Sequence, residues 1–448
     1  MKKHISIIGS GMSGCLMALC LAKEDYKIDI YEARSDIRKQ KKSSGRSFNI
    51  TLYTRGIIAL QKIDLWKDIK KISVLTKGNV AHYLDNRNIY DPYDSNDTEV
   101  LYTVNRNILN SKLLDIVEKN SNIKINFNTR LENIDKANKK ITLRNILSKR
   151  KFTKLTDLVI GADGVNSTVR KIINNKKNEK NVLALENWGY KEVQVTPQKS
   201  KLLKLKSSAT HTWPRRNSLF IAFPNPDKSN TLMINLPLKG ENSFETLKSK
   251  DIVTKYIVKN FPDLKFLLPE IVNSFLNKPT GKFTTILTNP WHYRDFILLI
   301  GDAAHGVIPF YGQGVCAAME DCLMVSELMK KYSHNLTHAF KEFEENRKID
   351  TDTLAILARD NFIELRDKSR SLYFIIKDKV DTILNRFFPK LWLPPLYILI
   401  AHGTITYDRA YRLYSRQLLI SRLIGLDLLI LAMTIPWFLT IEIKKRFK

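Results

Sequence analysis

Residues 4–14, HISIIGSGMSG, join a run of apolar residues to a glycine pattern, and they constrain the fold more than any other stretch of this chain. Gly9, Gly11 and Gly14 have the spacing GxGxxG directly after the predicted strand, and CLMALCLAKE continues as a predicted helix. The first glycine permits a tight turn, the second lets a pyrophosphate approach the backbone, and the third lets helix pack on strand. The pattern predicts a βαβ unit with a dinucleotide at the helix N-terminus.

The next predicted strand, KIDIYEA at 27–33, carries an acidic residue near its end. Glu32 stands at about the spacing at which such a carboxylate accepts hydrogen bonds from ribose hydroxyls. Two later segments, DLVIGADG at 157–164 and FILLIGDAAHG at 296–306, repeat the style of a buried strand that runs into a glycine turn. We therefore expect these segments to belong to the same α/β domain.

The pattern changes twice along the chain. From about 180 to 284, alternating segments such as SLFIAF and TLMINLPL, joined by Pro and Asn turns, predict a mostly antiparallel sheet, and after about 315 the chain is nearly all predicted helix. The expected fold class is α/β: a Rossmann-like nucleotide-binding domain, an interleaved mostly antiparallel β-sheet substrate domain, and a helical C-terminal region that ends in a hydrophobic segment. The expected divisions are 1–175 (nucleotide binding, with a substrate-side segment at about 70–105), 176–284 (substrate sheet), 285–345 (nucleotide binding), 346–417 (helical region) and 418–448 (tail).

Charge and cysteine usage exclude some functions. The net charge of +28, from 73 Lys and Arg against 45 Asp and Glu, is compatible with a polyanionic partner, but the basic residues are scattered and no nucleic-acid recognition motif accompanies them. The four cysteines lie in predicted helices without metal-binding spacing, so we expect buried thiols and no metal. A solvated basic surface with no nucleic-acid partner is the interpretation we favour.

The segment LIGLDLLILAMTIPWFLTI, at 423–441, is apolar over nearly the length of a membrane span and is followed by KKRFK. We expect a membrane-associating tail with the catalytic part facing the cytoplasm; the alternative is a buried C-terminal helix. Arginines also flank the other side of the segment, so charge does not decide between a spanning and an interfacial helix. The oligomeric state is left open.

Two further motifs complete a resemblance. GADGVNSTVR at 161–170 and GDAAHGVIPFYGQGVCAAMED at 301–321, together with GxGxxG, are similar to the three fingerprints of the flavoprotein aromatic hydroxylases of the para-hydroxybenzoate hydroxylase class. The resemblance implies that the dinucleotide is FAD. It also implies that Asp163 lies near the pyrophosphate and that Asp302 binds the ribityl chain.

Within that class, GRSFNITLYTRG at 45–56, VNRNILN, NFIELR and PPLY resemble the kynurenine 3-monooxygenase family over nearly the whole chain, and that family also ends in a membrane-associating segment. In the first of these stretches Arg46 is expected to pair with an anion, and Arg55 to cap or anchor the following helix. Besides the three glycines, the cofactor contacts that the motifs and the resemblance predict are Ser13, Tyr31, Glu32, Ala33, Arg34, Thr51, Arg106, Leu131, Asp163, Asp302, Val315 and Cys316.

The resemblance also predicts a substrate site. Its expected members are Lys77, Asn79, Tyr93, Asn361 and Tyr397. Asn79 stands where the family has an arginine, the natural clamp for a carboxylate. Either Lys77 replaces that arginine or the substrate lacks the carboxylate. Cys316 stands where the family has asparagine, which matters only if that side chain, rather than the backbone, faces the flavin.

The activity that the resemblance implies is the FAD-dependent hydroxylation of L-kynurenine to 3-hydroxykynurenine, with NADPH and O₂ as co-substrates. The resemblance also implies that the reaction passes through a flavin C4a-hydroperoxide. Because this chemistry is centred on the flavin, no side chain is assigned as catalytic. One alternative is hydroxylation of a different aromatic substrate that lacks the carboxylate anchor. Another is a membrane-tethered flavoprotein that acts as a redox-responsive interaction module.

Overall fold

The computed structural model describes residues 3–24, 26–39, 48–93, 100–174, 187–366, 372–423 and 425. Arg46 and most of the predicted membrane-associating tail, namely residues 424 and 426–448, lie outside the described residues. Among the helices that are described, none combines the length and the apolar character that crossing a membrane requires.

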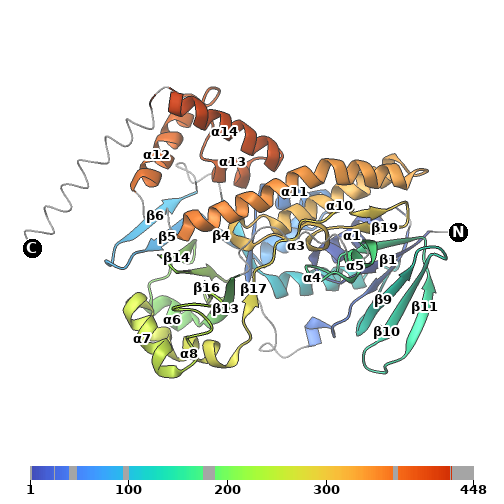
Figure 1. Cartoon of the computed structure of the whole chain (residues 1–448), viewed down its shortest axis with the longest axis horizontal. Coiled ribbons are helices and arrows are strands. Elements are labelled where there is room, and N and C mark those ends of the chain that lie inside the picture. The colour runs from blue at the N-terminus through green and yellow to red at the C-terminus, as the bar shows by residue number, and fades with distance from the viewer. Residues whose placement is uncertain are drawn as a thin grey trace, which may run out of the picture.

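A six-stranded sheet forms the centre of the nucleotide-binding part (Figure 1). Its core is parallel: β1 pairs with both β2 and β12, β12 pairs with β19, and β2 pairs with β8, while β18 adds an antiparallel edge. The central strands β1, β12 and β19 are apolar and almost entirely buried because helices cover the sheet, as is usual for parallel sheets. In sheet order they are β18 (His292–Tyr293), β19 (Ile297–Leu299), β12 (Leu158–Gly161), β1 (His4–Ile8), β2 (Lys27–Tyr31) and β8 (Ile123–Asn126).

A seven-stranded sheet forms the substrate part, and β5 from the first third of the chain pairs with β14 in parallel. The other pairs are antiparallel. Helices α7 (Lys250–Asn260) and α8 (Leu268–Asn277) pack against this sheet through a shared apolar core. In sheet order the strands are β17 (Gly281–Lys282), β13 (Trp188–Val195), β16 (Asn230–Pro237), β15 (Ser218–Pro224), β14 (Ala209–Arg215), β5 (Gly78–His82) and β6 (Asn88–Pro92).

Two three-stranded antiparallel sheets complete the strands. One is β3 (Asn49–Leu52), β7 (Leu101–Asn105) and β4 (Val74–Thr76); the other is β11 (Lys151–Leu155), β10 (Lys140–Asn145) and β9 (Thr129–Asp135), which projects from the body in Figure 1. The shorter helical elements are η1 (Ile37–Lys39), α2 (Thr54–Lys62), α3 (Trp66–Lys71), α5 (Thr168–Ile173), α6 (Pro197–Leu202), η2 (Pro262–Leu267), α9 (Asp302–His305) and η3 (Pro309–Tyr311).

Long helices connect the parts. α1 (Met12–Ala22) packs against α4 (Arg106–Glu118) and α10 (Gly314–Lys331), and α10 packs against α11 (Leu336–Arg366). The C-terminal helices α12 (Leu372–Phe387), α13 (Leu396–His402) and α14 (Tyr407–Leu423) form a group at one end of α11 (Figure 1).

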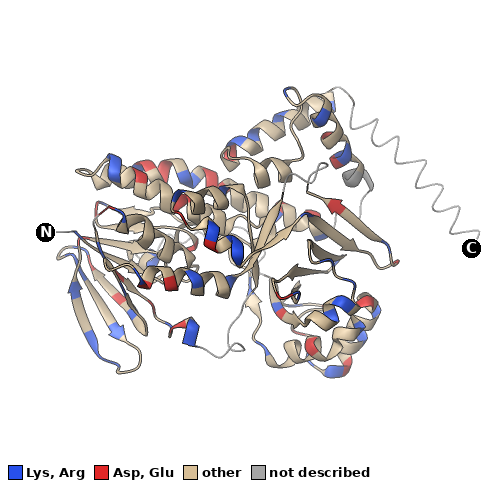
Figure 2. Cartoon of the chain, turned by 180° about the vertical axis from the view of Figure 1, so that it is seen from behind, with Lys and Arg blue, Asp and Glu red and all other residues tan. Residues whose placement is uncertain are grey.

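The predicted fold class is confirmed: an α/β nucleotide-binding part, antiparallel sheets and a helical C-terminal region. The structure adds helices α7 and α8, where alternation had predicted mainly strands. Figure 2 shows Lys and Arg spread over all parts of the molecule with Asp and Glu among them.

Candidate functional site

A cavity of about 630 Å³ lies where the parallel sheet, α1, α4, α10 and the edge of the seven-stranded sheet meet, a size typical of ligand sites. The predicted cofactor residues that line it are Gly9, Gly11, Ser13, Tyr31, Glu32, Ala33, Arg34, Arg106, Leu131, Asp163, Asp302 and Val315. Predicted residues that are spread along the chain from Gly9 to Val315 thus line one cavity. The predicted residues Gly14, Thr51 and Cys316 are not among those that line it.

The glycine turn has the geometry that its three positions require. Gly9 has φ +104°, and a Cβ there would lie 2.4 Å from the Ala162 carbonyl oxygen. A Cβ on Gly14 would lie 2.0 Å from the Gly9 oxygen, so Gly14 permits α1 to pack on the turn. Gly11 lines the cavity, and a Cβ there would meet no protein atom within 4 Å. The backbone at Gly11 is therefore open to a bound group.

Two helix N-termini face the cavity. α1 begins after Gly11 and α10 after Gln313, and neither has a side-chain cap or an acidic residue in its first turn. Their first residues, including Ser13 and Gly314, line the cavity. Uncapped amides at a helix N-terminus, together with the positive end of the helix dipole, favour anionic groups such as phosphates.

Glu32 occupies the far end of the cavity, at the end of β2. One carboxylate oxygen accepts from the Arg34 amide and Nε, each at 2.9 Å, and the other accepts from the Ser10 amide at 3.0 Å and its hydroxyl at 3.2 Å. Burial alone would raise the pKa of Glu32, but the hydrogen bonds and charge of Arg34 and the Ser10 amide lower it. The group is a buried carboxylate whose oxygens can accept hydrogen bonds from ribose hydroxyls.

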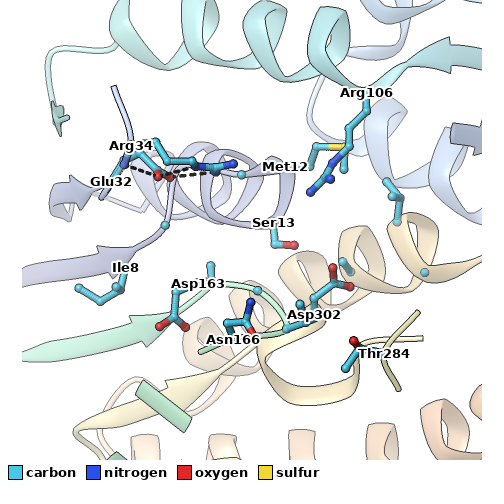
Figure 3. A pocket seen from close by; sticks show the side chains of 18 of the residues that line it. Ile8, Met12, Ser13, Glu32, Arg34, Arg106, Asp163, Asn166, Thr284 and Asp302 are labelled. Carbon is cyan, nitrogen blue, oxygen red and sulfur yellow. Dashed lines mark hydrogen bonds and ion pairs between the residues drawn. The ribbon is translucent and has the colours of Figure 1, made fainter. Parts of the chain in front are cut away.

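Charged side chains also face the middle of the cavity from two sides. In Figure 3 Arg106 reaches from the N-terminus of α4 toward Ser13, while Asp302 points to the same space from the N-terminus of α9. The Arg106 guanidinium also lies over Phe48, 5.6 Å from the ring centroid. This arrangement offers a cation and a carboxylate on opposite walls.

Asp163 lines the cavity but uses its carboxylate locally. It accepts hydrogen bonds from the Ser167 hydroxyl and from the amides of Thr168 and Val169, at 2.6 and 3.2 Å. Burial raises its pKa despite these bonds. The residue therefore fixes the start of α5 beside the cavity.

Cys316 and Thr51 contact each other, and neither lines the cavity. The Cys316 thiol is fully buried, lies 3.8 Å from the Thr51 carbonyl oxygen, and packs so closely on Gly56 that a Cβ there would lie 2.7 Å from the sulfur. Val315, one residue earlier, lines the cavity. Cys316, where the resemblance leads us to expect asparagine, thus packs between α10 and α2. The cofactor contacts expected of Thr51 and Cys316 stay predictions.

The expected substrate residues gather in a neighbouring region, although none lines the cavity. The Asn79 amide donates to Thr212 Oγ1 at 3.0 Å, and its oxygen accepts from Thr210 Oγ1 at 3.1 Å. Thr210 Oγ1 is also 3.1 Å from the Tyr93 hydroxyl. We call these hydrogen-bonded side chains of Asn79, Thr210, Thr212 and Tyr93 the Asn79 ladder. Lys77 adjoins it through its backbone carbonyl, which accepts a hydrogen bond from the Tyr93 amide at 2.9 Å.

Tyr397 lies in a group of aromatic residues that we call the tyrosine cluster: Tyr53, Tyr93, Tyr311 and Tyr397. The hydroxyls of Tyr53 and Tyr397 are 2.9 Å apart, and the rings of Tyr311 and Tyr397 lie 5.6 Å apart. Burial raises the pKa of all four phenols, so they stay protonated donors. Asn361 is held next to this cluster because it donates to the Phe310 carbonyl at 2.8 Å.

The motifs missed the aromatic end of the cavity. Phe48 meets Tyr190 edge to face at 5.9 Å, and Tyr190 stacks on Phe283 at 5.3 Å. Thr284, labelled in Figure 3, and Met233 also line this end. Tyr190 and Met233 lie in β13 and β16, while Phe48 directly precedes β3 and Phe283 and Thr284 directly follow β17. None of them has a glycine or charge signature, so only the folding of these separate segments reveals them. In the described part of the chain, no group of His, Cys, Asp and Glu is placed to hold a metal.

Comparison with known proteins agrees with this geometry. Residues 2–342 match the family described as "FAD binding domain". The kynurenine 3-monooxygenase of Legionella pneumophila (strain Corby) is 35% identical over 419 residues, 93% of this chain and 92% of that protein. The kynurenine 3-monooxygenase of Dictyostelium discoideum is 31% identical over 425 residues, covering 92% and 91%.

Solved structures show the same fold at low identity. The tetrameric form of 2-methyl-3-hydroxypyridine-5-carboxylic acid oxygenase has a TM-score of 0.67 at 20% identity and covers 82% of this chain and 93% of that one. P. aeruginosa PqsL in complex with 2-aminobenzoylacetate has a TM-score of 0.65 at 16% identity, covering 82% and 98%. Three features of the cavity fit FAD: the open backbone at Gly11, the two uncapped helix N-termini and the buried carboxylate of Glu32. The chain is an FAD-dependent monooxygenase that belongs to the kynurenine 3-monooxygenase family.

Proposed function

We propose that this protein hydroxylates L-kynurenine to 3-hydroxykynurenine with NADPH and O₂ as co-substrates. The observation that carries the proposal is the 35% identity to a kynurenine 3-monooxygenase over 93% of the chain. The assembly of Asn79, Tyr93, Asn361 and Tyr397 beside the cavity supports it.

The residues around the cavity supply positions for the cofactor. The N-termini of α1 and α10 would hold its phosphates, Glu32 a ribose, and Arg106 and Asp302 the middle of the molecule. FAD in this place supplies hydride acceptance from NADPH and the activation of O₂ for insertion of one oxygen atom into an aromatic ring.

The protein side of the mechanism is orientation and exclusion of water. Phe48, Tyr190 and Phe283 give the cavity an apolar end that suits an aromatic ring and keeps water from the reacting atoms. The tyrosine cluster adjoins the cavity through η3, whose Pro309 lines the cavity and whose Tyr311 belongs to the cluster and packs on Tyr397. We place the ring at the apolar end and the amino-acid part toward the tyrosine cluster, where protonated phenols and amides donate hydrogen bonds.

A second candidate function is hydroxylation of an aromatic compound without a carboxylate. It is favoured by Asn79, whose amide already bonds to Thr210 and Thr212 and carries no charge. A neutral amide does not replace the bidentate, charge-assisted contact of an arginine.

The experiment compares two substrates on the full chain loaded with FAD. L-kynurenine and the same aryl ketone without its carboxylate are each added with NADPH, and NADPH loss, peroxide and product mass are followed. Fast oxidation with L-kynurenine and a product heavier by one oxygen atom supports the first function. Coupled hydroxylation of only the carboxylate-free compound supports the second, and peroxide alone with both compounds contradicts both.

We also propose that residues 423–441 attach the protein to a membrane with the catalytic part facing the cytoplasm, because the segment is apolar and bounded by basic residues. Full-length protein should sediment with anionic vesicles, and a chain that lacks 423–448 should stay in solution. Equal sedimentation of the two would contradict attachment through this segment. In cells, protease added from the cytoplasmic side should digest the catalytic part, and protection from it would contradict the proposed orientation.

A further inference from the structure

Arg55 is buried near the N-terminus of α2, with a side chain only 2% exposed. Its guanidinium lies over the ring of Tyr407, 4.2 Å from the centroid, and pairs with Glu320 of α10 at 3.3 Å. It also donates to the carbonyl oxygen of Ile405, just before α14. One side chain therefore joins α2, α10 and the C-terminal helices, a larger role than capping or anchoring α2 alone, which the sequence predicted.

Tyr407 continues this connection toward the cofactor cavity. It is fully buried at the start of α14, and its hydroxyl donates to Gln313 Oε1 at 3.2 Å. Gln313 is the residue from which α10 begins, and its side chain does not cap that helix. The next two residues, Gly314 and Val315, line the cavity. The Tyr407 hydroxyl thus holds the turn that presents the α10 amides.

Arg347 of α11 makes a parallel connection. It pairs with Glu320 at 3.1 Å and with Asp350 at 2.8 Å, and it donates to the Ala317 carbonyl at 2.9 Å. The other oxygen of Asp350 accepts from the amide of Asp408 in α14 at 3.1 Å. The start of α14 is therefore fixed to α10 by two routes, one through Arg55 and Tyr407 and one through Arg347.

Asp321 extends the second route to the turn before α9, which also borders the cavity. One oxygen pairs with Arg347 at 2.9 Å, and the other accepts from the Gly301 amide at 2.9 Å and lies 2.5 Å from His305 Nε2. Burial alone would raise the pKa of Asp321, but His305, Arg347 and the Gly301 amide lower it to about 2. Asp302, which follows Gly301, lines the cavity.

Among the described residues, none of α11 to α14 contributes to the lining of the cavity, so these helices act on it only through the residues that they contact. Buried charges with all partners in place resist rearrangement, and loss of one partner leaves the others unsatisfied. The orientation of α14 is thereby tied to both turns that border the cavity, Gln313–Val315 and Gly301–Asp302.

We propose that Arg55 and Tyr407 are positioning residues for FAD: they transmit the docking of the C-terminal helices to the Gln313–Val315 turn, and α14 thereby sets how tightly the cofactor is held. The role concerns the cofactor alone and holds for any substrate. Both residues act through Gln313, since neither lines the cavity.

The decisive variant is Tyr407→Phe, with Tyr414→Phe as its matched control. Tyr414 lies on the same helix, and its hydroxyl donates to Asp381 at 2.9 Å, among the C-terminal helices and away from Gln313. Each change removes one hydroxyl from a tyrosine in α14. Apoprotein of the full chain is titrated with FAD by fluorescence, the visible spectrum of the bound flavin is recorded, and the thermal unfolding of the apoprotein is measured.

We expect Tyr407→Phe to raise the Kd for FAD by about three- to ten-fold, the effect of one lost hydrogen bond, and to shift the flavin absorption band. Tyr414→Phe should lower the unfolding temperature while leaving Kd and spectrum unchanged. An unchanged Kd in Tyr407→Phe, or equal shifts in the two variants, would overturn the proposal. The titration uses neither NADPH nor an aromatic substrate, so it is independent of the proposed hydroxylation.

Arg55 gives a graded test. Lysine keeps the charge opposite Glu320 but cannot lie flat on Tyr407 while it also reaches the Ile405 carbonyl. FAD affinity should therefore decrease from wild type to Arg55→Lys to Arg55→Met. Equal affinity in wild type and Arg55→Met would contradict the role of Arg55, and if Arg55→Met does not fold, Tyr407→Phe still decides the question.

Discussion

The side-chain amide of Asn79 donates a hydrogen bond to the hydroxyl of Thr212, 3.0 Å away on the neighbouring strand. Thr210 completes the arrangement, since its hydroxyl bonds to the Asn79 oxygen and lies within reach of Tyr93. A neutral ladder thus fills the position at which the kynurenine 3-monooxygenase resemblance leads us to expect a cationic clamp.

Asn79→Arg should tighten binding of a carboxylate substrate. A charge-assisted contact contributes about 1.5–3 kcal/mol, so KM for L-kynurenine should fall by about ten-fold or more while KM for the carboxylate-free analogue does not fall. Steady-state kinetics on both compounds provide the measurement, with Asn79→Gln as the uncharged control. An equal change for the two compounds would show that position 79 does not face the carboxylate.

Gly11→Ala should separate cofactor binding from folding. Gly11 has φ −70°, which alanine adopts readily, and the added Cβ meets no protein atom, so thermal unfolding of the apoprotein should not change. The methyl group enters the cavity and should weaken FAD binding by about ten-fold or more, the range of an overpacked site. Fluorescence titration measures the affinity.

Gly14→Ala is the matched comparison. Its Cβ would lie 2.0 Å from the Gly9 oxygen, so the apoprotein itself should be destabilised. Normal FAD affinity in Gly11→Ala would mean that the cofactor does not approach the backbone at Gly11.

His211 should make stability depend on pH. Burial and the neighbouring His82, whose Nε2 is 2.8 Å from His211 Nδ1, lower the pKa of His211 from 6.5 to about 4. The folded chain therefore binds this proton less readily than the unfolded chain, so stability is full above pH 6.5 and is lost progressively between pH 6.5 and 4. Linkage gives a loss of about 2 kcal/mol at pH 5.

Urea unfolding of the protein at pH 8 and pH 5 measures this loss, and His211→Gln should reduce the difference. Asp263, Lys206 and Arg215 surround the pair and stay in place in that variant. The same comparison on His338→Gln, which removes a half-exposed histidine outside this pair, measures the effect of losing a histidine elsewhere. An unaltered slope in His211→Gln would assign the pH dependence to other groups.

The cysteines should be inert while the chain is folded. Burial raises the pKa of Cys15 and Cys20 to about 12 and that of Cys316 to about 11, and the pKa of Cys322 is also raised well above its usual value. Because the thiolate is the reactive form, iodoacetamide at pH 8 should label none of them in the native protein and all four in urea. Intact mass measures the labelling, and rapid native labelling of Cys316 would place its thiol at the cavity.

The nucleotide half of the fold was predictable because its signals are local. The apolar run at His4–Ile8 and the glycines that follow define strand, turn and helix within a few residues. Alternation likewise identified β15 and β16, which pair with each other directly. By contrast, no local pattern shows that Gly78 pairs with Ala209 in a parallel register, because that pairing depends on the packing of distant segments.

The site divides in the same way. Glu32 and Gly11 reach the cavity from one βαβ unit, whereas Tyr53 meets Tyr397 only because α13 folds back against α2. The direction of the Cys316 side chain was left open by the sequence, since a position one residue from the cavity can face either way around a helix. Packing on Gly56 turns it toward Thr51.

The parallel pairing of β5 with β14 also fixes an order of events during synthesis. β5 and β6 form an edge hairpin whose link to the rest of the seven-stranded sheet is β14. An isolated hairpin is marginal in water, so β5 and β6 can join the sheet only after Ala209–Arg215 has been synthesised. The Asn79 ladder is therefore completed late, and a nascent chain that stalls before β14 exposes an unpaired strand edge to chaperones.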